Sequence, residues 1–177
     1  MKVINLFGCA GAGKSTCALG VTHYLKINYL KVEYVSEYAK QLVMSESSHL
    51  LKYQDHVFTN QLFQMEILRN KDLDYIVTDS PLLLSSFYGN KYGTSTAELN
   101  QLVNMHFNNF ENINYFINRT HKYDPTGRVQ TEEESNADSE LLLEFLQQNK
   151  VDFKRVNSHN LLSSYIAYEI LNSDDIK

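Results

Sequence analysis

Short apolar segments recur along the chain, and a segment with helical spacing follows each of them. The apolar segments cover residues 2–7, 31–35, 74–78, 114–118 and 151–156. Within residues 54–69, apolar side chains recur every three or four positions, and this spacing predicts a helix. A chain in which strands alternate with helices folds as a parallel sheet covered on both faces. The pattern therefore predicts an α/β fold with five parallel strands and helices on both sides.

Polar residues mark where several predicted helices begin. Ser36 precedes a helical stretch and suits an N-cap position. Two segments have the spacing of a capping box, Ser95 to Glu98 and Thr131 to Glu134, and we expect them to open helices that end near residues 110 and 148. Residues 88–93 contain two glycines and are predicted to form a loop.

A glycine-rich segment between the first strand and the first helix carries the clearest chemical signal. Residues 8–15 read Gly-Cys-Ala-Gly-Ala-Gly-Lys-Ser and match the P-loop pattern G-x-x-x-x-G-K-[ST]. Glycines let the backbone N–H groups point inward at an anion, and the helix amino terminus adds partial positive charge. Lys14 is then expected to reach the phosphates, and Ser15 to bind magnesium. The predicted site for ATP and Mg²⁺ consists of Gly8, Gly11, Ala12, Gly13, Lys14, Ser15 and Thr16.

Two acidic residues follow strands at the same edge of the predicted sheet. With the strand order 2-3-1-4-5, the P-loop lies at the carboxyl end of the central strand. Asp79 follows the third strand and is predicted either to hold the magnesium ion through a water or to help deprotonate an acceptor. Both roles are compatible with capping the helix that Pro81 begins. Glu37 follows the second strand. It either accepts a proton from an acceptor hydroxyl or only favours the helix dipole.

The loop after the fourth strand, residues 119–131, gathers basic residues in an otherwise acidic chain. Arg119 and Arg128 bracket it, and Gly127 gives the backbone freedom to turn. A mobile arginine can stabilise the charge that develops during phosphoryl transfer. We therefore predict that this segment, named the lid loop, closes over the site and that both arginines are catalytic. The alternative is a solvated loop with ordinary surface charges.

Two glutamines on the long middle helix, Gln54 and Gln61, also have two possible roles. Their amides either bind the edge of a base or sugar, or they belong to the solvated face of the helix.

Composition limits the class of protein. The chain has 177 residues and a net charge of -5, which suits a single domain over residues 1–177 and argues against a broad basic nucleic-acid surface. It contains no long apolar run that would span a membrane. We expect no signal peptide and a cytoplasmic location. Cys9 and Cys17 are too few for a disulfide framework or a zinc site. The oligomeric state is left open.

Four stretches taken together resemble a known family. They are residues 8–15, 35–40, 78–84 and 123–134. They are similar to the small P-loop kinase-like proteins of tailed bacteriophages, which are related to the nicotinamide riboside kinase and thymidylate kinase-like groups. The resemblance implies a five-stranded P-loop kinase fold, ATP, magnesium and, for a phage-encoded chain, the host cytoplasm. The same broad set includes phage enzymes that phosphorylate 5-hydroxymethyluracil in DNA.

The chain departs from one pattern of this group. Deoxynucleoside kinases usually carry an acid-Arg-Ser triplet after the third strand, whereas here Ser80 and Pro81 follow Asp79. An arginine would then have to come from the lid loop, as Arg119 or Arg128.

These observations favour a kinase that transfers a phosphoryl group to a nucleoside-like acceptor. The acceptor is either a free nucleoside or nucleotide, including the nicotinamide riboside type, or a hydroxymethylated base in DNA, which would have to leave the base stack. The other class of function is a P-loop ATPase or switch that acts on a protein partner.

Overall fold

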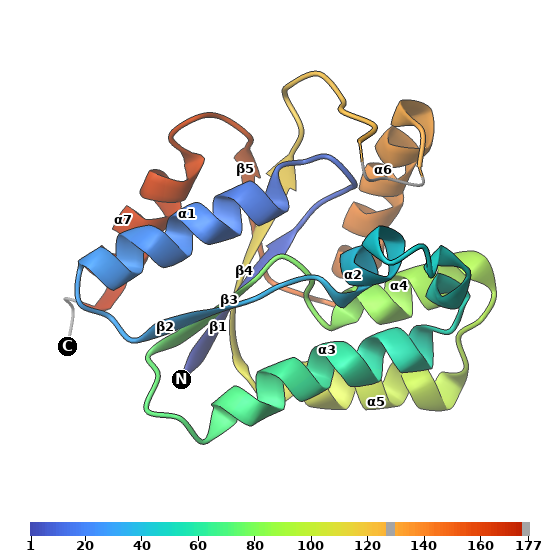
Figure 1. Ribbon diagram of the computed structural model, residues 1–177, viewed down its shortest axis with the longest axis horizontal. Helices are drawn as coiled ribbons and strands as arrows, with labels where there is room; N and C mark the ends of the chain where they lie inside the picture. Colours follow the sequence, from blue (N-terminus) through green and yellow to red (C-terminus); the bar gives the residue numbers. More distant parts are fainter. Residues whose placement is uncertain (127–129, 175–177) are drawn as a thin grey trace.

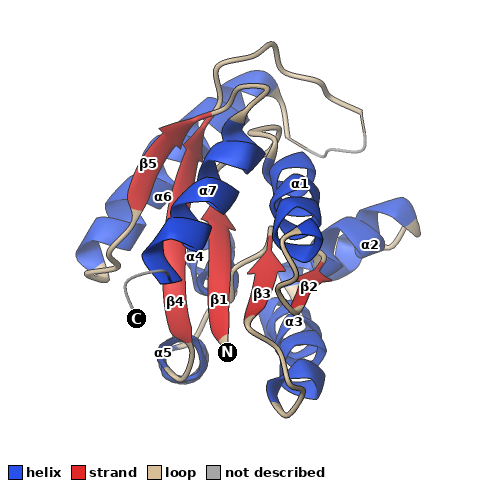
Figure 2. Cartoon of the chain, turned by 90° about the vertical axis from the view of Figure 1, so that its left-hand side faces the viewer, coloured by secondary structure: helices blue, strands red, loops and turns tan. Residues whose placement is uncertain are grey.

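Five parallel strands form one sheet in the computed structural model, which describes residues 1–126 and 130–174. The strands are β1 (Lys2–Phe7), β2 (Val32–Val35), β3 (Tyr75–Thr78), β4 (Glu111–Asn118) and β5 (Lys154–Asn157). Their order is β2-β3-β1-β4-β5 and every neighbouring pair is parallel. The predicted fold and strand order are confirmed, and all carboxyl ends lie at one edge of the sheet (Figure 2).

Helices cover both faces of this sheet (Figure 1). One face carries α1 (Lys14–Ile27) and α7 (Leu162–Asp174), which pack against each other. The other face carries α3 (Gln54–Arg69), α4 (Leu83–Tyr92), α5 (Ala97–Asn108) and α6 (Glu132–Gln148). Two short helices, α2 (Tyr38–Met44) and the 3₁₀ helix η1 (Ser48–Lys52), follow the carboxyl end of β2.

The central strand β1 shows why both faces must be covered. Its side chains alternate between the faces, so Ile4 and Leu6 join the core beneath α1 and α7, while Val3 and Phe7 join the core on the other side. All four are fully buried. Because β1 is buried on both faces, the loop that follows it begins from the core of the sheet.

The predicted loop at residues 88–93 is wrong, because α4 continues through Tyr92. Gly89 lies inside the helix, where the side chain of Ser95 packs so closely that a Cβ on Gly89 would lie 2.9 Å from the Ser95 Cβ. The helix ends only at Gly93, whose φ of 66° is the left-handed conformation that favours glycine. The glycine pair therefore serves packing and helix termination.

Helix starts and strand ends differ from the sequence expectation in detail. Thr96 caps α5 by accepting a hydrogen bond from the Leu99 N–H, so the cap is one residue after the predicted Ser95. The capping box of Thr131 and Glu134 is confirmed and opens α6. The N-cap of α2 is Glu37, not the predicted Ser36, and the Glu37 side chain makes no capping hydrogen bond. Strand β4 begins three residues before its predicted start, and strand β5 begins three residues after its own predicted start.

Stability is expected to fall in alkaline solution because buried acids are held protonated. Burial raises the pKa of the Cys17 thiol from 9.0 to about 12, and burial followed by the charge of Glu169 raises the pKa of Tyr115. When a group has a higher pKa in the folded chain than in the unfolded chain, its contribution to stability is complete below the pKa of the unfolded chain. That contribution is lost as the pH rises toward the pKa of the folded chain. The free energy of unfolding should therefore decline above about pH 9 in urea titrations.

The variant Cys17→Ala provides the control for this decline. It removes one of the raised pKa values, so its stability should fall less between about pH 9 and pH 10 than that of the parent chain. A free energy of unfolding that stays constant across this range in the parent would contradict the expectation.

Candidate active site

The P-loop adopts the curled backbone that its glycines allow. Gly8, Gly11 and Gly13 all have positive φ, at 145°, 74° and 86°. A Cβ on Gly8 would lie 2.8 Å from the carbonyl oxygen of Ile117 on β4, so only glycine fits there. Lys14 begins α1, and its ammonium group donates to the carbonyl oxygens of Gly8 and Cys9 at 2.9 and 3.0 Å. The lysine therefore lies folded over the loop that is predicted to bind phosphate.

Neighbouring elements hold the P-loop in place. Ser135 of α6 is fully buried, and its hydroxyl donates to the carbonyl oxygen of Ala10 at 2.8 Å. On the other side, His121 of the lid loop lies next to Gly13. Its Nδ1 is 3.0 Å from the hydroxyl of Ser158, which follows β5. The loop is thus fixed by segments from three different parts of the chain.

Asp79 lies directly after β3 and is almost completely buried, with 1% of its surface exposed. Its Oδ1 atom has no hydrogen-bond partner among the described residues. An unsatisfied buried polar atom costs about 1–3 kcal/mol, and more when it is charged, so the position suits a cation. Ser15, predicted as the other magnesium ligand, begins the same helix as Lys14. The two residues supply the oxygen atoms that Mg²⁺ prefers.

A metal at this position would need ligands beyond these two. No cluster of three or more His, Cys, Asp or Glu that could hold a metal occurs within residues 1–126 and 130–174. Magnesium at phosphoryl-transfer sites commonly has one or two protein ligands and takes the others from phosphates and water. The residues present therefore fit a magnesium ion that binds together with a nucleotide.

Tyr34 also belongs to this site, although no sequence pattern singles it out. It lies opposite Val77 in the β2–β3 register, and Asp79 follows two positions later, where side chains return to the same face. The Tyr34 hydroxyl interacts with the Asp79 carboxylate and the Ser15 hydroxyl. Burial, and then the negative charges of Asp79 and Glu37, raise the pKa of Tyr34. The phenol is therefore protonated at neutral pH and can donate to the carboxylate.

A cavity of about 480 Å³ extends from the P-loop past Glu37 to α2, η1 and α4. Glu37 also lines a second cavity of about 470 Å³ together with Asp79 and Tyr34. Glu37, the predicted base, thus lines both the cavity on the P-loop side and the cavity on the Asp79 side. Cavities of this size are large enough for a small organic ligand.

Two tyrosines of α4, Tyr88 and Tyr92, line the large cavity. Their rings are stacked, with centroids 6.0 Å apart and an angle of 15° between the planes. Burial, and then the charges of Glu37 and Asp138, raise the pKa of Tyr88, while a hydrogen bond with Gln130 acts in the opposite direction. We call Tyr88 and Tyr92 the aromatic wall of the cavity. The sequence does not predict this wall when residues 88–93 are taken as a loop, because the two rings come together only through helical spacing.

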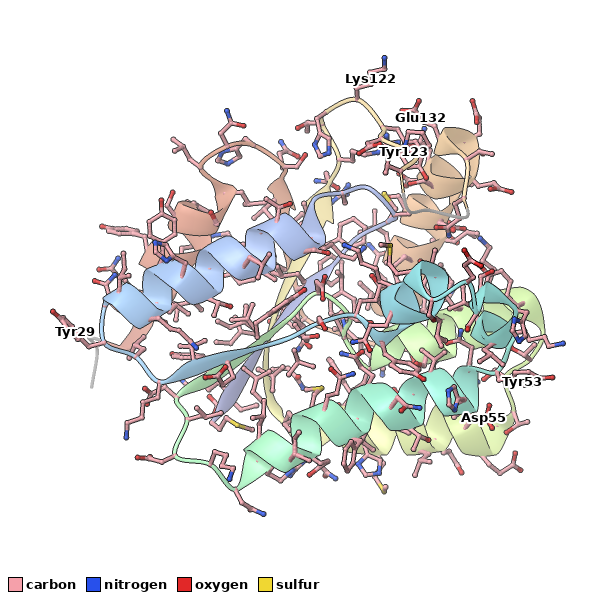
Figure 3. All side chains as sticks on the ribbon, viewed as in Figure 1. Tyr29, Tyr53, Asp55, Lys122, Tyr123 and Glu132 are labelled. Atoms are coloured by element: carbon pink, nitrogen blue, oxygen red, sulfur yellow. The ribbon has the colours of Figure 1, made fainter. Side chains whose placement is uncertain are left out.

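Arg119 is tied to α6. Its guanidinium group donates to Glu132 at 2.9 Å and to Asn136 at 2.6 Å, and lies 4.8 Å above the ring of Tyr123. Figure 3 shows Tyr123 and Glu132 close together on this side, while Lys122 projects away from the molecule. Arg119 is not among the residues that line either cavity. The other predicted lid arginine, Arg128, and Gly127 lie outside the described residues.

The two glutamines of α3 are buried, so neither lies on a solvated face. Gln61 accepts a hydrogen bond from the Tyr38 N–H at 3.0 Å and donates to the Ser36 carbonyl at 3.3 Å. It therefore fixes the backbone on both sides of Glu37. Gln54 lines the large cavity and donates to the Leu51 carbonyl.

A parallel sheet of this order, with the glycine loop after its central strand and an acid after the adjacent strand, defines the P-loop NTPase fold. A family model described as an AAA domain, AAA_28, matches residues 3–162. The chain belongs to this AAA domain family and is a P-loop nucleotide-binding protein. No curated protein matches the chain. None of the helices in the described part of the chain is both long and apolar enough to cross a membrane.

The variant Lys14→Ala should bind nucleotide at least about tenfold more weakly, because it removes the charged donor to the phosphates. Titration calorimetry with a non-hydrolysable ATP analogue measures this change. Lys71→Ala is the matched control, since Lys71 is exposed in the connection between α3 and β3, at the opposite edge of the sheet. Equal affinity in Lys14→Ala and the parent chain would show that the P-loop lysine does not contact the nucleotide.

The variant Tyr34→Phe keeps the ring but removes the hydroxyl that interacts with Asp79 and Ser15. Nucleotide affinity without magnesium should stay the same, whereas the gain in affinity on adding magnesium should fall about fivefold, the effect of one hydrogen bond. Tyr24→Phe on α1 is the control. If magnesium raised the nucleotide affinity of Tyr34→Phe as much as that of the parent chain, the Tyr34 hydroxyl would have no role in magnesium binding.

Proposed function

We propose that the protein is an ATP- and magnesium-dependent kinase that transfers the γ-phosphoryl group to a hydroxyl of a nucleoside-like acceptor. The observation that carries this proposal is the single cavity that joins the P-loop, Glu37 and the stacked tyrosines. A nucleotide switch needs space for its nucleotide alone. A kinase needs a second compartment of this kind for the acceptor.

The P-loop side of the cavity binds the donor. Backbone N–H groups of the loop and the ammonium group of Lys14 hold the phosphates, and Ser15 and Asp79 hold the magnesium ion. The ion neutralises charge on the phosphates when bound. The buried position of Asp79 excludes water from this side and strengthens its interaction with the metal.

Glu37 is proposed as the base. Its carboxylate accepts the proton of the acceptor hydroxyl while the hydroxyl oxygen bonds to the γ-phosphorus. The bond from that phosphorus to the bridging oxygen breaks, and ADP leaves with the bonding electron pair. Gln61 positions the peptide backbone around Glu37, so the base is held on a rigid part of the fold.

The wall formed by Tyr88 and Tyr92 supports a flat acceptor ring, because aromatic faces stack on such rings. From the phage resemblance, the candidate acceptors are a free nucleoside or nucleotide and 5-hydroxymethyluracil in DNA. Arg128 is retained as the proposed lid arginine. Arg119 contributes by holding the start of the lid loop on α6.

Incubation with γ-labelled ATP tests the proposal directly. Label should appear on a nucleoside, a nucleotide or DNA containing 5-hydroxymethyluracil. Label released only as inorganic phosphate, with every acceptor, would overturn the kinase assignment and favour an ATPase that acts on a protein partner.

The variant Glu37→Gln should lower kcat by about a hundredfold, because an amide cannot accept the proton. The KM for ATP should change little, since Glu37 is not part of the P-loop. Glu144→Gln, on an exposed position of α6, is the control. Full turnover in Glu37→Gln would assign the base to another residue.

A further inference from the structure

Two lysines line the large cavity on the side beyond Glu37. Lys40 belongs to α2 and Lys52 to η1. Lys40 also lines the second cavity, with Glu37 and Asp79. Both lysines are exposed, so their ammonium groups can reach a ligand from the wall without losing all contact with water.

Neither lysine forms an ion pair within the described parts of the chain. Most other lysines on the surface do, as shown by Lys26 with Glu33, Lys91 with Asp138 and Lys154 with Glu169. The ammonium group of Lys52 lies over the Tyr53 ring, 5.0 Å from its centroid. In a chain with a net charge of -5, two lysines without an acidic partner at one cavity form a local positive region.

The charge of the cavity wall supports the same conclusion. Glu37 is the only acidic residue among the described residues that line the large cavity, whereas three lysines line it: Lys14, Lys40 and Lys52. Lys14 already serves the P-loop, where it contacts the loop carbonyls. Lys40 and Lys52 therefore leave positive charge on the acceptor side that the predicted donor site does not use.

We propose that Lys40 and Lys52 form a subsite for a phosphate carried by the acceptor. The acceptor is then a phosphorylated compound of the nucleotide class, with its ring against Tyr88 and Tyr92 and its phosphate at the two lysines. This inference rests on the proposed kinase function. The phosphate is either the monoester of a free nucleotide or the diester of a nucleic acid strand, because a lysine binds both as a point charge.

Equilibrium binding tests the subsite separately from catalysis. The P-loop is first saturated with magnesium and a non-hydrolysable ATP analogue, so that an added phosphate cannot bind there. Calorimetric titrations then compare 2′-deoxynucleosides, their 5′-monophosphates and a short single-stranded oligonucleotide. We expect at least one phosphorylated ligand to bind about tenfold more tightly than its nucleoside, the effect of two exposed charge contacts.

The double variant Lys40→Gln with Lys52→Gln should remove this preference and leave nucleoside binding unchanged. Lys26→Gln together with Lys71→Gln removes the same charge away from the cavity and should keep the preference. A preference for the monophosphate identifies a free nucleotide, and a preference for the oligonucleotide identifies a strand. With an acceptor that is found to receive the phosphoryl group, the double variant should have a higher KM for that acceptor and an unchanged kcat.

The two proposals fail in different ways. Label transfer from ATP to nucleosides and to their monophosphates with equal KM, together with equal binding of both, overturns the phosphate subsite and leaves the kinase intact. Binding that prefers the phosphorylated ligand, without transfer to any acceptor, overturns the kinase and leaves an anion site. A preference that survives in the double variant also overturns the assignment to Lys40 and Lys52.

Discussion

The close approach of two backbones at Gly8 is the constraint on which the site depends. The loop leaves β1 with a φ of 145° at Gly8, directly against the carbonyl of Ile117, where no side chain fits. Strand β1 is buried on both faces and pairs with β3 and β4. The sheet therefore holds the residue from which the loop begins. Ser135 then holds the loop from α6 through Ala10. The anion site is therefore preorganised by the sheet, and little conformational entropy has to be lost when phosphate binds.

The same sheet order brings the acidic residues together. Strand β2 is at the edge and pairs only with β3, so the segment after β2 lies beside Asp79. Gln61 is buried between them, with hydrogen bonds to the backbone of Tyr38 and Ser36. A buried amide that satisfies the backbone of a turn fixes its geometry, because leaving those groups unpaired would be costly. The position of Glu37 is thus set by a glutamine from another helix.

The sequence was sufficient to predict the framework and the position of the P-loop in it. Strands and helices alternate with clear periods, and the P-loop pattern sets the central strand, so the order of the sheet could be predicted before any coordinates. The acceptor side was less accessible. Gly89 looked like a loop residue because its packing partner, Ser95, becomes visible only in three dimensions. Treating residues 88–93 as a loop concealed the stacking of Tyr88 and Tyr92, which depends on a four-residue helical spacing.

Tyr34 illustrates a different limit. Within its strand it reads as one more apolar position, and only the register with β3 places its hydroxyl beside Asp79. For Arg119 the sequence indicates only a basic loop, and the fold adds that its hydrogen-bond partners lie on α6. Tertiary contacts decide which of several similar residues reaches a ligand. Local pattern cannot supply those contacts, because they join segments far apart in the chain.

In the proposed reaction, the cavity has to bring the phosphates of the donor, the phosphate of the acceptor and the carboxylate of Glu37 close together. Charges of the same sign repel with an energy that grows as water is excluded, so a donor and a phosphorylated acceptor would not share a cavity lined by neutral groups. The three lysines that line the cavity would reduce this repulsion. Lys14 offsets the charge of the donor, and Lys40 and Lys52 offset that of the acceptor. In this proposal the carboxylate of Glu37 approaches the acceptor hydroxyl.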